Sequence, residues 1–431
     1  MKTNERQMHL AVFWLGTGNH TAGWRTEGAA DSNCSWDIAE AGARIAERGK
    51  FDLFFISDSL APDLADHPSF ITRFEPTTLV AALSRATSRV GLGATVSSSF
   101  ADPFTVARTF QTLQHLSRGR VAWNVVTSTS PKAALNFSRE RHHEHDLRYE
   151  IANEFVDVVR GLWDTWQTGA VVRDRATGTY IDPAKVRTLD HQGRHFQVRG
   201  PLNVERPEWG DPLIIQAGGS VPGQELSART ADIVFAVVSG DPAAAKASYD
   251  GLKSLLHKYG RKPHDLALLP GVMPIVGDTE ADARAKLEKF QSFLPQKGAL
   301  TLVSNRIGHD LSAYDLDGPI PDLPATERSQ TFSATLLDKA RGEGMSLRDL
   351  YNLTAAARGH WVLPGTPRTI ADTLEEWFRA GRADGFMILP PYFPGAFDEF
   401  VDRVVPELQR RGLFRKDYEG TTLRSHLRKE R

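Results

Sequence analysis

Short polar side chains follow or end several buried hydrophobic runs of this 431-residue chain. Asp58 comes just after one run, while Thr95 and Asn124 lie near the ends of two others. Hydroxyl, amide and single carboxylate groups suit hydrogen bonding to a polar heterocycle, whereas hydrolysis requires paired carboxylates or a nucleophile beside a base. The pattern therefore predicts a site that holds a cofactor by hydrogen bonds. Each residue taken alone is also compatible with a plain strand-end cap.

A Gly218-Gly219-Ser220 turn precedes a helical segment. Such a turn presents backbone N–H groups and a hydroxyl to an anion, and the helix dipole adds to the attraction. The same serine could serve only as a helix N-cap. Its place after a late strand, where barrels often bind phosphate, favours a phosphate site at Ser220.

His145 and Tyr149 are four residues apart, so on a helix they share one face and can reach one ligand. The surrounding HHEHD run is also typical of a solvated helix start. A metal site would have to use His142, His143 and His145, but neighbouring histidines on a helix point in different directions. No matching carboxylate pair ends another strand, so the sequence predicts no bound metal.

Eight nearly continuous hydrophobic runs alternate with amphipathic segments. Such runs are typical of parallel strands that are covered on both faces. The glycine fingerprint of a doubly wound sheet is absent after the first run, which is followed by GTGNHTAGW. We therefore predict an α/β fold, a (β/α)8 TIM barrel. Its strands begin at His9, Phe51, Val90, Val121, Pro212, Asp232, Leu266 and Gly385, and its helices include Ser35 to Arg48, Pro103 to Ser117, Asp146 to Trp166, Asp278 to Leu294 and Pro367 to Ala380.

The segments between predicted strands 4 and 5 and between strands 7 and 8 are longer than a single helix and its loops require. We predict one barrel domain over residues 1–431, with insertions of about 168–210 after strand 4 and about 297–362 after strand 7. Long insertions in a compact domain usually act as lids or assembly surfaces. The polar, basic end of the chain, about 415–431, is expected to be a tail or an arm over a neighbour.

Charge and cysteine content exclude several classes of protein. Lys and Arg number 52 against 53 Asp and Glu, so no positive field favours nucleic acid or an anionic membrane as a partner. Cys34 is the only cysteine, which rules out an internal disulfide, and we expect it to be buried or half-buried. The hydrophobic start is too short for a signal sequence or a membrane span, so a cytoplasmic location is expected.

Several long motifs occur together in one order: FDLFFISDSLA, VGLGATVSSSFADPFTVARTFQTLQHLSRGRVAWNVVTS, HDLRYEIANEFVDVVRGLWDTW, IIQAGGSVPGQELSARTADIVF and ADGFMILPPYFPGAFDEFVDRVVPELQRRGLF. From about Met8 to Leu427 the chain resembles the flavin-dependent, bacterial-luciferase-like monooxygenases. The resemblance is to their branch with nitrilotriacetate monooxygenase component A, EDTA monooxygenase and dibenzothiophene sulfone monooxygenase. It implies a luciferase-like barrel that binds FMN.

The resemblance also implies an activity and a set of partners. A separate NAD(P)H:flavin reductase would supply FMNH2, which reacts with O2 to a flavin peroxide that oxygenates a small organic substrate. Sulfones, sulfides, amino-polycarboxylates and aromatic compounds are the substrate types of such enzymes. A homodimer or homotetramer is expected. Carried over by position, the cofactor-binding residues are Asp58, Thr95 and Asn124 at the isoalloxazine, His145 and Tyr149 on a helix beside the flavin, and Ser220 at the phosphate.

The substrate and the catalytic residues are left open by the sequence. Aromatic residues could line an apolar pocket together with the second insertion, and basic residues could instead bind carboxylates; the aromatic set is Phe13, Trp14, Trp24 and Phe100, and the basic set is His20, Arg25 and Arg73. Alternatives are a deazaflavin-dependent oxidoreductase on the same barrel, a non-catalytic flavin-binding protein, or a metal-dependent barrel hydrolase. The last usually has an HxH motif on strand one, where this chain reads His9-Leu10-Ala11.

Overall fold

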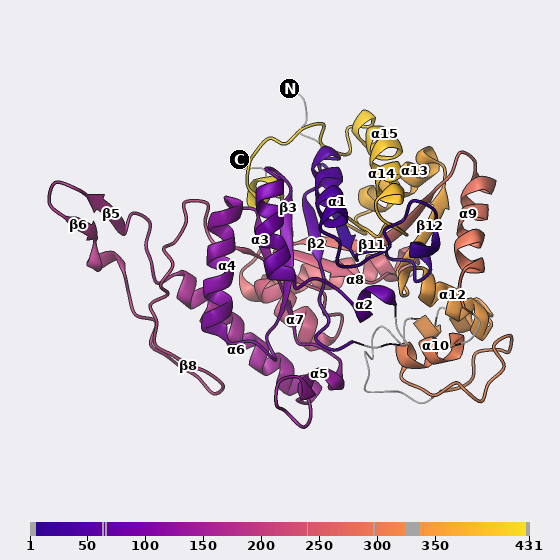
Figure 1. The fold of residues 1–431 in the computed structure, drawn as a ribbon, viewed down its shortest axis with the longest axis horizontal. Coiled ribbons are helices and arrows are strands. Elements are labelled where there is room, and N and C mark those ends of the chain that lie inside the picture. Colours follow the sequence, from indigo (N-terminus) through magenta and orange to yellow (C-terminus); the bar gives the residue numbers. More distant parts are fainter. Residues whose placement is uncertain are drawn as a thin grey trace.

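Eight parallel strands close into a barrel in the computed structural model, which describes residues 6–427 except 63, 65–66, 239, 296–297, 324–335 and 339. Each strand pairs with the next around the ring, and pairing of β13 with β1 and of β10 with β11 completes the closure (Figure 1). The predicted (β/α)8 barrel is confirmed. Its strands are β1 (His9–Trp14), β2 (Leu53–Ile56), β3 (Gly91–Ser97), β4 (Val121–Val126), β9 (Leu213–Gln216), β10 (Ile233–Ala236), β11 (Ala267–Val276) and β13 (Gly385–Ile388).

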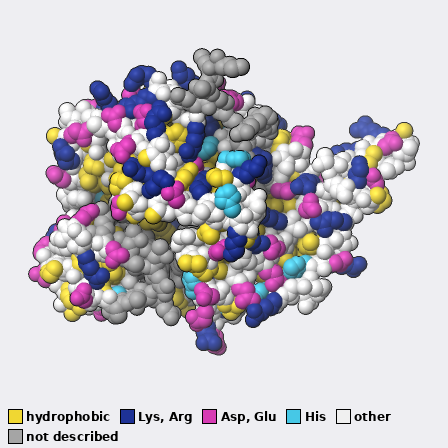
Figure 2. Space-filling view, turned by 180° about the vertical axis from the view of Figure 1, so that it is seen from behind, with side chains coloured by type: hydrophobic (Ala, Val, Ile, Leu, Met, Phe, Trp, Pro, Cys, Tyr) yellow, Lys and Arg dark blue, Asp and Glu magenta, His cyan; other side chains and the backbone are white. Residues whose placement is uncertain are grey.

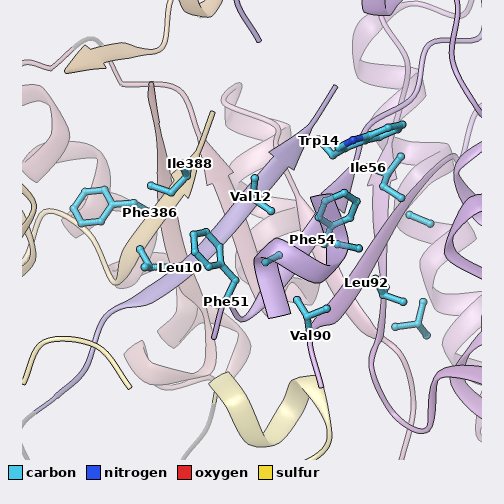
Figure 3. Packing of buried hydrophobic residues seen from close by; sticks show 14 of the residues in the cluster. Leu10, Val12, Trp14, Phe51, Phe54, Ile56, Val90, Leu92, Phe386 and Ile388 are labelled. Carbon is cyan, nitrogen blue, oxygen red and sulfur yellow. The ribbon is translucent and has the colours of Figure 1, made fainter. Parts of the chain in front are cut away.

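Along each strand, alternate side chains pack into two different parts of the hydrophobic core. One set, which includes Phe13, Phe55 and Phe235, packs inside the barrel. The other set faces the surrounding helices, as Figure 3 shows for Val12, Phe54 and neighbouring residues. Because a strand turns successive side chains to opposite faces, burial on both sides explains the continuous hydrophobic runs.

Helices cover the outside of the barrel and begin at capping side chains such as Asp102 and Ser220. The predicted helix Pro103 to Ser117 is found with the same ends, whereas α6 ends three residues before the predicted Trp166. Among the described residues, no helix is long and hydrophobic enough to span a bilayer. The main helices are α1 (Trp36–Arg48), α3 (Pro76–Ala86), α4 (Pro103–Ser117), α6 (His145–Trp163), α7 (Val221–Thr230), α8 (Pro242–Leu255), α9 (Glu280–Ser292), α13 (Pro367–Arg379), α14 (Gly395–Arg403) and α15 (Val405–Arg410).

The stretch between β4 and β9 holds two small antiparallel hairpins after α6. The first, β5 (Val171–Asp174) with β6 (Thr179–Ile181), projects from the body as an arm. Figure 2 shows the same arm from behind, with side chains of both charges along it. The second hairpin joins β7 (His191–Gln192) to β8 (Gln197–Val198) and also lies within the insertion predicted at about 168–210.

The stretch between β11 and β13 forms a small lobe beside the barrel. It contains α10 (Ala299–Ile307) and α12 (Leu347–Ala357), which share a hydrophobic core that includes Val303 and Leu350. The strand that follows, β12 (Trp361–Gly365), pairs with the second half of β11. Residues 297, 324–335 and 339 of the predicted insertion lie outside the described residues. The lobe is anchored to the loop after β1 by a bond from the Thr21 backbone N–H to the Ala355 carbonyl.

The C-terminal segment packs on its own barrel rather than extending away as a tail. Leu423 of α16 (Leu423–Leu427) is fully buried among inward residues at the amino ends of the strands. The Tyr418 hydroxyl donates to the Phe51 carbonyl at 2.7 Å, and Arg415 pairs with Asp52 at 2.6 Å. Residues 428–431 of the predicted tail lie outside the described residues. The segment from 415 to 427 therefore closes the end of the barrel opposite the candidate site.

Candidate active site

Thr95 and Asn124 are partners on adjacent strands at the carboxyl end of the barrel. The Thr95 hydroxyl donates to the Ile56 carbonyl at 2.8 Å, so its oxygen accepts from the Asn124 amide Nδ2 at 2.9 Å. This order of donation fixes the orientation of the amide. The Asn124 Oδ1 atom is buried and has no hydrogen-bond partner among the described residues. It is thus an acceptor that remains available to a ligand N–H.

Aromatic rings fill the barrel interior at the same end. Phe13 lies 5.3 Å from both Phe55 and Phe235, measured between ring centroids. The His360 ring stacks on Phe235 at 4.9 Å with an interplanar angle of 4°. Thr95 and Asn124 continue the inward-facing positions of their strands, so the unpaired amide oxygen adjoins a hydrophobic floor. Such a floor excludes water from whatever lies above it.

Asp58 lies in the loop just beyond β2, two residues after the Ile56 carbonyl that Thr95 holds. It is half-buried and accepts from the Ser59 backbone N–H at 2.8 Å. Burial raises the pKa of the Asp58 carboxyl, although the Ser59 bond and the positive charge of Arg73 act in the opposite direction. The residue is therefore a carboxylate in a partly desolvated position at the strand ends.

The predicted helix pair and the predicted phosphate turn are brought together. The His145 and Tyr149 rings on the first turns of α6 lie 5.1 Å apart. A Cβ at Gly218 would lie 2.8 Å from the Tyr149 hydroxyl oxygen, and one at Gly223 would lie 2.9 Å from it. Only glycine therefore leaves room for this hydroxyl beside the start of α7. The tyrosine places a hydrogen-bonding group at the turn predicted to hold a phosphate.

Ser220 is the N-cap of α7, and its side chain accepts from the Gly223 backbone N–H at 3.4 Å. The structure is compatible with Ser220 as a helix cap and with Ser220 as a phosphate ligand. A capping serine also lies where the helix dipole attracts an anion. The serine is half-buried, and the backbone of Gly218 passes close to that of Gly223. The turn is thus compact and open to solvent on one side.

Two of the three histidines that could have formed a metal site, His142 and His145, have side-chain partners within the protein. His142 Nε2 lies 3.2 Å from the Thr127 carbonyl and 3.1 Å from the Ser128 carbonyl, while its Nδ1 accepts from the His143 backbone N–H at 3.0 Å. His145 Nδ1 pairs with Asp146 at 2.8 Å. Among the described residues, no group of three or more His, Cys, Asp or Glu side chains could hold a metal ion. His142 instead ties the loop before α6 to the end of β4.

One of the residues named for the substrate pocket lies elsewhere. Trp14 faces the helix layer and packs against Phe54, so the expectation that it lines the pocket is wrong. Trp24 is exposed, and Phe100 is stacked on Phe137 and His142, with ring centroids 4.8 Å apart in each pair. Cys34, expected to be at least half-buried, is exposed. The parity of strand positions and the course of loops decided these outcomes.

His20 lies in the loop after β1 and is fully buried against Phe290. Its Nδ1 accepts from the Ala22 backbone N–H at 3.1 Å, so the neutral ring carries its proton on Nε2. That Nε2 is buried without a hydrogen-bond partner among the described residues. Burial lowers the pKa of His20 to about 3, so the ring remains neutral at physiological pH.

Sequence reasoning missed two residues at the barrel mouth, Arg358 and His360. Both come from the end of the second insertion, more than 300 residues away from Phe13 in the chain. The Arg358 guanidinium lies over the Phe13 ring, with its Cζ atom 4.8 Å from the ring centroid. No local pattern pointed to these residues, because their role depends on the return of the chain from α12 to the barrel.

The donor and acceptor groups of this face fit an FMN molecule. An unpartnered amide oxygen beside aromatic rings suits a heterocycle that carries N–H groups, and the N-terminus of α7 with the Tyr149 hydroxyl suits a phosphate. These groups match FMN in the hydrogen bonds that they can make and in their attraction for a negative charge.

Comparison with known proteins identifies one family. A family model described as luciferase-like monooxygenase matches residues 12–384. The chain is 45% identical to the N-acetyl-S-(2-succino)cysteine monooxygenase of Bacillus subtilis (strain 168), over 99% of this chain and 97% of that protein. It is 43% identical to nitrilotriacetate monooxygenase component A of Aminobacter aminovorans, over 98% and 96%. A solved riboflavin lyase with modified FMN and riboflavin matches with a TM-score of 0.88 and 29% identity, over 98% and 96% of the two chains.

Proposed function

Because this chain belongs to the luciferase-like monooxygenase family, we propose that it is the oxygenase component of a two-component system that uses FMN. A separate NAD(P)H:flavin reductase supplies the cofactor as FMNH2, and O2 is the co-substrate. One relative is component A of nitrilotriacetate monooxygenase, and this name supports a divided system. A related structure that contains modified FMN supports the choice of flavin.

The observation that carries this proposal is the unpartnered Oδ1 of Asn124. A buried acceptor without a partner costs about 1–3 kcal/mol, so a ligand donor that supplies the missing bond is strongly favoured. The amide cannot turn to relieve this cost, because Thr95 needs its Nδ2 as a donor. The N–H groups of an isoalloxazine ring are donors of the required kind.

The other proposed binding residues are assigned from their positions relative to Asn124 Oδ1. We assign Thr95 to positioning Asn124, and Asp58 to the edge of the isoalloxazine site at the end of β2. His145 and Tyr149 would contact the flavin from α6, and Ser220 would bind its phosphate at the start of α7.

FMN supplies the electrons and the reactivity toward O2 when it is bound, and the protein supplies orientation and a dry site. The rings of Phe13, Phe55 and Phe235 exclude water below the cofactor. His20 offers a neutral N–H donor from the loop after β1. No side-chain pair resembles hydrolytic machinery among these residues, which agrees with oxygenation chemistry that belongs to the cofactor.

The substrate is a small organic molecule. Two relatives are named for the oxygenation of N-acetyl-S-(2-succino)cysteine and of nitrilotriacetate. By the same analogy we infer a substrate of the sulfide, sulfone, amino-polycarboxylate or aromatic type. A homodimer or homotetramer in the cytoplasm completes the proposal, and the single cysteine suits a reducing compartment.

The test is a reconstitution in two steps. The anaerobic protein is titrated with FMNH2 and then mixed with O2 in the presence of candidate substrates, and 18O2 is used to follow the oxygen atom into product. We expect saturable binding of FMNH2 and one labelled oxygen atom in the product. Omission of FMNH2, or replacement of it by a reduced deazaflavin, should abolish the product. Failure of the protein to bind FMNH2 would refute the proposal.

A further inference from the structure

The arm formed by β5 and β6 is a two-stranded sheet that stands away from the body of the molecule in Figure 1 and in Figure 2. Within the described part of the chain, neither strand pairs with a strand outside this hairpin. A two-stranded hairpin is only marginally stable in water, whereas more strands with a hydrophobic face form a stable sheet. We propose that the arm pairs with the arm of a second copy of this chain, through the free edge of β6 and across a two-fold axis at Tyr180.

The first argument is the direction of the backbone groups of β6. The Asp182 backbone N–H donates to the Ala170 carbonyl at 2.8 Å, on the side of β5. Because these groups alternate in direction along a strand, those of Thr179 and Ile181 point to the opposite side, which is the free edge. Among the described residues, the Thr179 N–H meets the Thr177 hydroxyl at 3.4 Å, longer than a typical bond. The edge therefore offers backbone groups to another strand.

The second argument is the contrast between the two edges of the arm. The pairing of β5 is irregular between Val171 and Asp174, and Arg173 within this stretch has a left-handed conformation with φ of 53°. Bulges and charged side chains protect a sheet edge from pairing with another strand. The residues of β6 are threonine, tyrosine and isoleucine, all of which favour strands. The edge of β6 is thus the one suited to pairing.

The third argument is the register that a two-fold axis imposes. With the axis at Tyr180, the two β6 strands run antiparallel and Tyr180 faces its own copy. Thr179 then faces Ile181 of the partner subunit, and these residues with free backbone groups form the hydrogen-bonded pairs on both sides of the axis. Beyond them Gly178 faces Asp182 of the partner subunit, so no like charges are opposed along the paired edge.

The fourth argument is the exposed hydrophobic pair on one face of the arm. Val171 and Ile181 are cross-strand partners, so their neighbours Val172 and Tyr180 lie together on the opposite face. The side chain of Val172 is 47% exposed and that of Tyr180 is 66% exposed. In the paired sheet the two tyrosines lie side by side at the centre with a valine outside each. This row supplies the hydrophobic face that a single arm lacks.

The competing explanation is that the arm binds a different protein, such as the flavin reductase. Such a contact has no two-fold axis, so position 180 does not face itself. The inference specifies an interface for the homo-oligomer in the proposed function, and it does not depend on flavin chemistry. Two paired arms form an interface smaller than that of a stable dimer, so we expect the contact to depend on protein concentration or to add to another interface between copies.

Disulfide cross-linking tests the position of the axis. Tyr180→Cys is made in a chain that carries Cys34→Ser, because Cys34 is exposed and is the only natural cysteine. Opposed residues of antiparallel strands have Cα atoms about 4.5–5.5 Å apart, a distance that suits a disulfide. Val172→Cys in the same background is the matched control, because Val172 is exposed on the same face but lies off the axis.

We expect mild oxidation to link Tyr180→Cys chains into covalent dimers about tenfold faster than Val172→Cys chains. Equal rates for the two variants, or no covalent dimer of Tyr180→Cys, would overturn the inference.

A charge-swap experiment tests the contact without a new covalent bond. A charged residue that faces its own copy repels it, so Tyr180→Asp and Tyr180→Lys should each lower the mean mass measured by sedimentation. An equal mixture of the two should recover the mass, because an aspartate then faces a lysine. Ala176→Asp, at an exposed position in the turn of the arm, should behave as the wild type. Thermal unfolding verifies that each variant is folded.

A wild type that stays monomeric at all concentrations, a mixture that does not recover the mass, or a loss of reductase binding at unchanged mass would overturn the inference. Binding of FMNH2 is measured in parallel. Failure of the wild type to bind FMNH2 would refute the proposed function and leave the mass and cross-linking results standing.

Discussion

At the scale of single residues, the site is defined by polar atoms that the protein leaves unsatisfied. Asn124 Oδ1 and His20 Nε2 are both buried without partners among the described residues, one an acceptor and the other a donor. Native proteins seldom leave such atoms unpaired. Both lie toward the carboxyl end of the barrel, where we propose that a bound molecule completes the hydrogen bonding of Asn124.

Replacing Asn124 by leucine should weaken FMN binding about tenfold, because the loss of one buried hydrogen bond costs about 1–2 kcal/mol. The affinity is measured by quenching of FMN fluorescence. Asn136→Leu is the control, because Asn136 is exposed and its side-chain amide donates to the Leu60 carbonyl. Equal FMN affinity in the Asn124 variant and the wild type would remove the main support for the isoalloxazine assignment.

Ser220→Ala tests whether the serine binds the phosphate or only caps α7. We expect FMN affinity to fall about five- to tenfold and riboflavin affinity to stay constant, because riboflavin lacks the phosphate. Ser35→Ala is a close control, since Ser35 caps α1 with a bond of the same 3.4 Å length. If both ligands weaken equally in Ser220→Ala, the serine acts through the fold of the turn.

At the scale of elements, the two ends of the barrel are closed in different ways. The lobe of α10 and α12 lies at the carboxyl end, and α16 closes the amino end with Leu423. A Cβ at Gly91 would come within 2.6 Å of the Leu423 side chain, so this contact is tightly packed. The last described helix is thus part of the barrel core, while the lobe lies at the opposite end.

Leu423→Ala should destabilise the protein by about 3 kcal/mol, the typical cost of truncating a fully buried leucine. The midpoint of urea unfolding measures the effect. Leu64→Ala serves as the control because Leu64 is 81% exposed and should change stability little. A similar small effect in both variants would mean that α16 adds nothing to the barrel.

At the scale of the whole molecule, buried ionisable groups make stability depend on pH although the net charge is only −1. Burial lowers the pKa of His20 to about 3 and that of His426 to about 4, so both are neutral in the folded protein. Burial also disfavours the Asp52 carboxylate, but Arg415 and His9 outweigh this and hold its pKa well below the usual range. These groups lie at both ends of the barrel.

Stability should fall as the pH is lowered from about 7 to 5. The unfolded chain protonates both histidines below their ordinary pKa of 6.5, while the folded chain does not, so each histidine costs about 2 kcal/mol of stability between pH 7 and pH 5. Asp52 contributes linkage of the same sign in a lower pH range: its stabilisation is present above its ordinary pKa and is lost only in stronger acid.

The measurement is the free energy of unfolding in urea at pH 7 and pH 5. His426→Gln should reduce the difference between the two, because glutamine can still donate to the Gly420 carbonyl but does not titrate. His264→Gln, at an exposed position, should leave the difference unchanged. An undiminished pH dependence in His426→Gln would show that this histidine is not neutral in the folded state.

The sequence by itself determined the features that depend on local chemistry. Burial on both faces made the strands continuous hydrophobic runs, so all eight could be located and the barrel predicted. The helix from Pro103 to Ser117 was predicted with its observed ends, Ser220 was recognised as a possible N-cap, and helical spacing put His145 and Tyr149 on one face. Each of these features depends on only a few neighbouring residues, so it could be predicted without knowledge of the tertiary contacts.

Only the tertiary structure decided which distant residues meet. Trp14 was expected in the pocket, but strand parity turns it to the helix layer. Arg358 and His360 come from an insertion without a telling motif, and the left-handed turn after α12 carries them to Phe13 and Phe235. The same holds for Leu423 at the other end. The physical reason is that barrel closure brings together residues hundreds of positions apart, and such contacts leave no local pattern in the sequence.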